Sequence, residues 1–158
     1  MKINSNFKEA NLYYIKSNFQ ILISKLCVRL LNNNLKILIN TKNKLENSEL
    51  DKFLWVNDNN SFIPHISFDD PELSEEKLVL FYGNQINFER FKKFDVLIFS
   101  PSVMIKKLKI FTKFFLFSYN NNNSNYHEHK LSLEKKGFKV KIFLEQENFK
   151  WKNLQNNE

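Results

Sequence analysis

The sequence predicts an α/β fold, a three-layer α/β/α sandwich around a mostly parallel central sheet. Short apolar runs of strand character alternate with amphipathic helical stretches, and the first strand, helix and second strand follow one another with short links. Such a strand–helix–strand unit is parallel and right-handed almost by rule. Because the 158 residues contain no repeat or long linker, we expect one domain over residues 1–151 and a polar, frayed tail over residues 152–158.

The N-terminal strand–helix–strand unit is the clearest part of this pattern. Residues 11–17 are aromatic and β-branched, as in a strand. Over residues 18–32, apolar side chains recur every three or four positions, which predicts an amphipathic helix. The asparagines at 32–34 should end this helix, because Asn competes with the helix backbone and tolerates the left-handed conformation. Residues 35–39 are mostly apolar, which is typical of a strand covered on both faces.

The rest of the chain continues the alternation of helices and strands. A second helix is predicted over residues 42–55, and a helix over 126–136 is closed by Gly137. The other predicted elements are strands over 77–82, 94–99 and 109–118, a short helix over 102–107, and a last strand over 138–144 at a sheet edge.

The counts of glycine and cysteine exclude several kinds of site. With only Gly83 and Gly137, the chain lacks a phosphate-binding loop, so the fold is Rossmann-like without a nucleotide loop. The single Cys27 lies on the apolar face of the first helix, where a thiol acts as a small hydrophobe. One cysteine and three histidines are too few for a structural zinc site. We therefore expect no metal and no cofactor.

Three polar clusters are candidates for chemistry, and each has a simpler interpretation. Residues 100–102 (Ser-Pro-Ser) follow a strand but lack the glycines of a nucleophile elbow, so a helix cap is favoured. Residues 69–72 (Asp-Asp-Pro-Glu) are typical of a solvated turn. His127 and His129, two positions apart on a helix, point to different sides and do not share a metal. No catalytic site is expected.

The charge balance favours acidic or polyanionic partners. The chain has 24 Lys and Arg against 17 Asp and Glu, for a net charge of +7. The cations are dispersed, with no run of five, so direct nucleic-acid binding is only weakly indicated. A bias toward Asn, Lys, Phe and Ile resembles mutational drift in an AT-rich genome, which lowers the weight of the charge. No run reaches the length of a membrane span and no signal peptide is evident, so a cytoplasmic location is expected.

The most specific feature is the stretch over residues 50–65. It reads Leu-Asp-Lys-Phe-Leu-Trp, then the loop Val-Asn-Asp-Asn-Asn, then Ser-Phe-Ile-Pro-His. This order resembles the chi subunit of bacterial DNA polymerase III, whose members carry Leu-Asp-x-x-Leu-Trp, a short polar loop and Ser-Phe-x-Pro-His. The resemblance is specific over residues 35–65, moderate over 126–151, and limited to strand order between them. Where the family commonly has Gly before the second strand, this chain has Asn34, which tolerates a left-handed position.

The resemblance implies a non-catalytic accessory subunit of the clamp-loader assembly. Such subunits pair with the psi subunit on one surface. On another they bind the acidic C-terminal tail of the single-stranded-DNA-binding protein, so that contact with nucleic acid is mainly indirect. A site for that tail needs an aromatic-lined cleft for the terminal apolar side chain and cations for the carboxylates.

The family's tail site carries over to this chain residue by residue. Trp55 and Phe62 match its aromatic residues, and Pro64 and His65 are expected to hold the adjoining loop. Among the family's basic helix positions, the expected Arg is replaced by His127, which lacks the bidentate guanidinium.

The expected Lys falls at Leu131, where the neighbouring Lys130 can take its place in part. The resemblance thus assigns the acidic tail to Trp55, Phe62, His127 and Lys130. Because the Arg is replaced, three outcomes are open: weaker binding, pH-dependent binding, or a site moved to Lys130, Lys135 and Lys136.

Three alternatives remain open from the sequence. Trp55 and Phe62 have a plain interpretation as core residues. A basic module that binds single-stranded nucleic acid directly would cluster its lysines on one face. A small Rossmann-like enzyme would have a deep polar pocket at the C-terminal ends of the strands. The psi-binding surface has no recognisable motif in the sequence.

Overall fold

A computed structural model describes residues 8–56, 66–67, 77–83, 94–103, 113–120, 125–147 and 150–154. The described helices are α1 (Phe19–Asn32), α2 (Lys44–Val56) and α3 (Tyr126–Lys135). The described strands are β1 (Lys8–Ile15), β2 (Ile37–Thr41), β3 (Ile66–Ser67), β4 (Leu78–Tyr82), β5 (Val96–Phe99), β6 (Lys113–Tyr119), β7 (Phe138–Glu145) and β8 (Trp151–Asn153).

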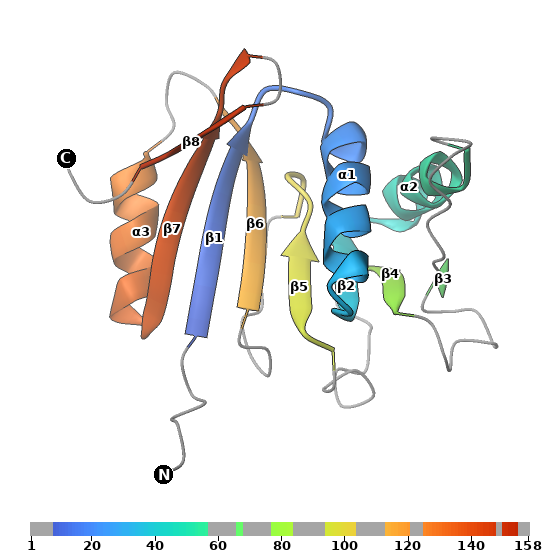
Figure 1. Ribbon diagram of the computed structural model, residues 1–158, viewed down its shortest axis with the longest axis horizontal. Coiled ribbons are helices and arrows are strands. Elements are labelled where there is room, and N and C mark those ends of the chain that lie inside the picture. The colour runs from blue at the N-terminus through green and yellow to red at the C-terminus, as the bar shows by residue number, and fades with distance from the viewer. Residues whose placement is uncertain are drawn as a thin grey trace, which may run out of the picture.

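The strands form one sheet in the order β3-β4-β2-β5-β6-β1-β7-β8 (Figure 1). Neighbours are parallel throughout except for β7 and β8, which are antiparallel. The predicted α/β fold with a mostly parallel sheet is therefore confirmed.

Helices pack on both faces of the sheet. Alternate residues of each strand point to opposite sides, and in the buried strands both sets are apolar, so each face needs a covering layer. On one face, Ile37 and Ile39 of β2 pack with α1 and α2 in one hydrophobic cluster. On the other face, Leu38 packs in a second cluster that includes Leu133 of α3. This arrangement confirms the predicted three layers.

The ends of α1 follow from its asparagines. The side chain of Asn18 accepts hydrogen bonds from the backbone N–H groups of Gln20 and Ile21, as an N-cap does. Asn33 is the C-cap, and Asn34 has a positive φ of 63°, the left-handed conformation predicted for it. Between these ends Cys27 is fully buried, and burial raises the pKa of its thiol to about 12, so the thiol is inert.

The C-terminal part of the sheet differs from the prediction. The strand expected at a sheet edge is β7, and it lies between β1 and β8. The tail expected to be frayed from residue 152 begins inside β8, where Lys152 pairs with Leu144. A strand of three residues is too short to show a periodic apolar pattern in the sequence. It forms because its backbone pairs with β7, and this pairing depends on the tertiary structure. The helix expected over residues 102–107 lies largely outside the described residues.

Candidate functional site

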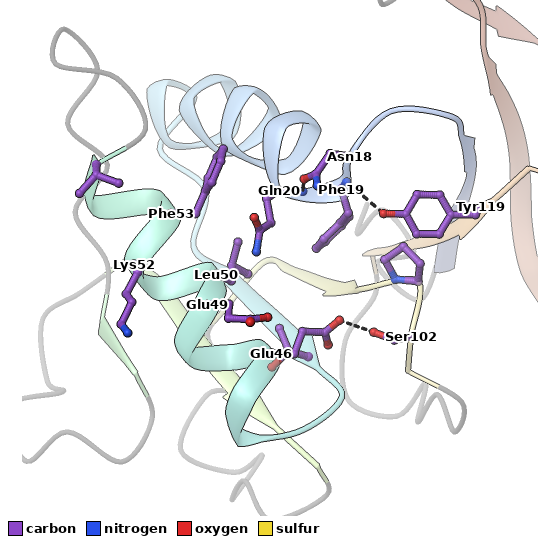
Figure 2. A pocket seen from close by; sticks show the side chains of 13 residues that line it. Asn18, Phe19, Gln20, Glu46, Glu49, Leu50, Lys52, Phe53, Ser102 and Tyr119 are labelled. Carbon is purple, nitrogen blue, oxygen red and sulfur yellow. Dashed lines mark hydrogen bonds between the residues drawn. The ribbon is translucent and has the colours of Figure 1, made fainter.

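One pocket of the structure lies at the carboxyl edge of the parallel sheet, where ligands bind in many α/β folds. This carboxyl-edge pocket has a volume of about 690 Å³ (Figure 2). Figure 2 shows Phe19 and Gln20 extending from the start of α1 toward α2, with Tyr119 beside Phe19 and Ser102 beside Glu46 of α2. Its lining residues are Asn18, Phe19, Gln20, Thr41, Glu46, Glu49, Leu50, Lys52, Phe53, Val56, Pro101, Ser102 and Tyr119.

Several polar groups of this pocket form hydrogen bonds that hold the fold together. Glu46, in the first turn of α2, accepts hydrogen bonds from the hydroxyls of Ser100 (3.2 Å) and Ser102 and from the backbone N–H of Lys42. This carboxylate therefore fastens α2 to the loop that follows β5. The first N–H groups of α1 are capped by Asn18, so they do not present the free donors that a phosphate needs.

Among the described residues, the lining of the carboxyl-edge pocket contains no histidine or cysteine that could pair with a serine or serve as a nucleophile. Among the described residues, no group of three or more His, Cys, Asp or Glu side chains is placed to hold a metal ion. The pocket lies where the alternative of a small Rossmann-like enzyme would place its active site. Its contacts between Glu46 and the two serines, however, join α2 to the loop after β5.

Trp55 lies on the surface near the end of α2. Its side chain is 49 % exposed, so the interpretation of Trp55 as a core residue is wrong. Phe62, Pro64 and His65 lie outside the described residues. The aromatic pair predicted from the sequence is thus placed for Trp55 only.

The second group of predicted residues lies on α3. His127 is exposed and Lys130 is half-buried. His129 lies between these two residues in the chain, and its Nδ1 lies 2.6 Å from the hydroxyl of Tyr14. Burial, together with the neighbouring Tyr126, raises the pKa of Tyr14 to about 12, so this phenol keeps its proton at neutral pH.

Next to this contact lies a cavity of about 240 Å³, which we call the α3 cavity. Its apolar lining comes from Leu12, Leu116 and Leu133, and its charged residue is Lys136. The remaining lining residues are Tyr14, Ser118, His129 and Ser132.

The structure does not bring Trp55 together with His127 and Lys130. The helix α2 packs beside β2 and β4, whereas α3 packs on β7 and covers the opposite face. Figure 1 shows α2 and α3 near opposite ends of the sheet. Four strand spacings separate β2 from β7, or about 19 Å. The residues assigned to one tail pocket therefore belong to two separate regions.

A third site was not predicted from the sequence. Three rings lie in a row across neighbouring strands, with Tyr13 stacked on Phe117 (centroids 4.8 Å apart, planes at 14°) and on Phe143 (5.0 Å, 15°). Trp151 of β8 lies nearly perpendicular to the Tyr13 ring, at 5.4 Å and 78°. These rings and Leu22, Lys25, Leu26 and Arg29 of α1 line an aromatic cleft of about 350 Å³.

The electrostatics of the aromatic cleft are positive. Its charged residues, Lys25 and Arg29, come from one side of α1, and none of its lining residues is acidic. Burial raises the pKa of Tyr13, against the smaller opposing effects of the Asn11 hydrogen bond and the Arg29 charge. One sequence signal was present: Lys25 and Arg29 are four residues apart and so share one helix face. The ring row depends on pairing between strands far apart in the chain, and Trp151 had been assigned to the end of the domain.

The sequence was compared with models of protein families. The model of the DNA polymerase III chi subunit, HolC, matches residues 8–130, which is most of the chain. The chain belongs to the chi family. The resemblance seen in residues 35–65 is thereby confirmed, and the protein is assigned to the accessory subunits of DNA polymerase III. A search of curated proteins found no match.

The chi match covers some of the described sites more fully than others. The carboxyl-edge pocket and Trp55 lie wholly within residues 8–130, and so do His127 and Lys130. Phe143 and Trp151 of the aromatic cleft lie beyond that segment.

None of the described helices is long and apolar enough to span a membrane.

Proposed function

We propose that this chi-family subunit serves DNA replication as a tether without chemistry of its own. It links the clamp-loader complex, through a psi-like subunit, to the acidic C-terminal tail of the single-stranded-DNA-binding protein. The match to the chi family over residues 8–130 carries this proposal. The net charge of +7 supports it, since a basic protein attracts an acidic tail over long distances.

The α3 region is the better supported site for the tail. A terminal apolar side chain would enter the α3 cavity, against Leu12, Leu116 and Leu133. The terminal carboxylate would lie near Lys136, and the preceding acidic residues near Lys135 in the last turn of α3 and Lys130 in the middle of the helix. This position agrees with one of the alternatives predicted from the loss of the family Arg at His127, in which the tail site is moved toward the lysines of α3.

Trp55 is then proposed as a separate contact on the other side of the sheet. Its half-exposed indole at the end of α2 suits an apolar partner segment, with Phe62 expected beside it. A tail at α3 and a second contact at Trp55 would place two arms of the assembly on opposite faces of one subunit.

Calorimetric titration with an acidic peptide ending in Pro-Phe tests the function. We expect a micromolar affinity at low salt that weakens as salt rises, because exposed ion pairs are screened. Lys130→Ala combined with Lys136→Ala should weaken binding by roughly tenfold. The matched control, Lys44→Ala with Lys52→Ala on α2, should leave the affinity unchanged. If the peptide does not bind at low salt, the tether function is wrong; equal losses in both double variants would remove the site from α3.

A gain-of-charge variant gives a second measurement. His127→Lys places a permanent cation where the family has Arg, and should tighten peptide binding by roughly two- to fivefold. Weaker or unchanged binding would show that the tail does not reach the start of α3.

A further inference from the structure

The aromatic cleft has features that core packing does not explain. Tyr13 and Phe143 are only partly buried, and Trp151 is 38 % exposed. In Figure 1, no helix is drawn over β6, β1 and β7 on the side where α1 crosses β2. The cleft therefore opens on a stretch of sheet that the described helices leave uncovered.

Cations lie on both sides of the rings. Lys25 and Arg29, about 6 Å apart along α1, form one wall. On the other side Lys141 is exposed and lies two residues before Phe143, on the same face of β7 and about 7 Å along the strand. These positive charges are spread along the cleft instead of converging on one point.

Among the described residues, no acidic side chain lines the cleft. The helix α1 contains no Asp or Glu, and β8 contains none. Glu145, further along β7, is buried and accepts hydrogen bonds from the backbone N–H groups of Lys16 (2.7 Å) and Ser17 (2.8 Å). Glu145 is the cross-strand partner of Trp151 and lies on the same face of β7 as Phe143, but its charge is balanced by these donors. Glu9 lies toward the other end of β1, between Lys113 and Lys139 on the neighbouring strands.

We infer that the aromatic cleft binds single-stranded nucleic acid, a function separate from the tethering of an acidic tail. Single strands are bound by cations that follow the phosphates and by aromatic rings on which bases stack, whatever the sequence. The exposed indole of Trp151 supplies a stacking surface, and the stacked rings of Tyr13 and Phe143 line the cleft beside it. Lys25 and Arg29 on one side and Lys141 on the other neutralise successive phosphates.

The spread of charge favours a nucleic acid over a peptide end. A peptide that ends in an aromatic residue needs one apolar pocket and a compact set of cations for its carboxylate. The α3 cavity has that form, with Lys136 beside an apolar floor. The aromatic cleft instead has separated cations along an open groove, which fits a chain that carries one charge on every unit.

Fluorescence anisotropy with a labelled oligothymidine of roughly 15 nucleotides tests this inference on the full chain. We expect binding at low salt that weakens steeply as salt rises. Lys25→Ala with Arg29→Ala should lower the affinity by roughly tenfold and reduce the slope of log affinity against log salt by roughly 1.4. Trp151→Ala should lower it by roughly fivefold or more, and Trp151→Phe, which keeps a ring, should retain most of it.

Matched controls separate this site from the tail site. Trp55→Ala, at a tryptophan of similar exposure, and Lys130→Ala with Lys136→Ala should leave oligonucleotide binding unchanged. The acidic peptide should bind the Lys25 and Arg29 double variant as it binds the unmodified chain. No binding of the oligonucleotide at low salt, or equal losses in the control variants, would overturn the inference. If the peptide loses affinity in the Lys25 and Arg29 variant and displaces the oligonucleotide, the cleft is a peptide site.

Discussion

The carboxyl-edge pocket and the aromatic cleft use their polar groups in different ways. In the pocket, Glu46 is bonded to two serine hydroxyls and a backbone N–H, so its charge holds the protein together. In the cleft, Lys25 and Arg29 border an open groove without a carboxylate among the lining residues. The edge that binds ligands in many α/β folds is thus stabilised by internal hydrogen bonds, whereas the cleft over the sheet is lined by cations.

The carboxylate of Glu145 holds the start of α1, the helix that borders both the carboxyl-edge pocket and the aromatic cleft. Glu145 at the end of β7 accepts hydrogen bonds from the backbone of Lys16 and Ser17 and from the Ser17 hydroxyl. These bonds hold the turn between β1 and α1. They therefore fix where α1 begins, and with it the position of Lys25 and Arg29 beside the rings.

The largest expected effect is the loss of stability in Glu145→Ala. This change leaves two backbone donors without their acceptor at a site where the side chain is only 2 % exposed, and we expect about 3 kcal/mol of destabilisation. Glu145→Gln keeps one acceptor oxygen and should lose about half as much. Urea denaturation measures both, with the exposed Glu147→Ala as the control. A loss below about 0.5 kcal/mol in the alanine variant would contradict the structural role.

The same carboxylate predicts a pH dependence of stability. Burial raises the pKa of Glu145, but the hydrogen bonds from Ser17 and Lys16 outweigh it, and the pKa is lowered in the folded state. A lowered folded pKa means that this stabilisation is present above the unfolded pKa and is lost as the pH falls through the folded value. Denaturation curves at decreasing acid pH should therefore converge for the unmodified chain and Glu145→Gln. A constant difference between them would contradict the prediction.

Glu46→Ala should have the next largest effect, at about 2 kcal/mol. It removes the acceptor for Ser100, which is fully buried, and for Ser102. Glu49→Ala, one turn away at an exposed position of the same helix, is the matched control and should change the free energy of unfolding by less than about 0.5 kcal/mol. Equal effects in the two variants would mean that the carboxyl-edge pocket is not held by Glu46.

The smallest expected effect sharpens the comparison most. Lys25→Ala with Arg29→Ala should change the free energy of unfolding by less than about 0.5 kcal/mol per residue, because both side chains are exposed. The same variant should weaken oligonucleotide binding strongly. A large loss of stability would instead give these cations the structural role that Glu46 has in the pocket.

The local features of this protein were determined by the sequence alone. The spacing of apolar residues predicted α1 and the burial of Cys27, the asparagines at 32–34 predicted the C-terminal end of α1, and the stretch over residues 50–65 predicted the family. These features depend on residues within one or two helical turns of each other, so a local pattern is sufficient to determine them.

The sites depend on contacts that only the tertiary structure decides. Trp55 and His127 were assigned to one pocket, but parallel pairing places α2 and α3 on opposite faces of the sheet. Tyr13 meets Phe117 and Phe143 because β1 pairs with both β6 and β7, and Trp151 joins them because β8 adds an antiparallel edge. Each contact joins residues about a hundred positions or more apart, except that between β7 and β8. Which strand pairs with which depends on the burial of apolar side chains over the whole sheet, and no short stretch of sequence encodes that.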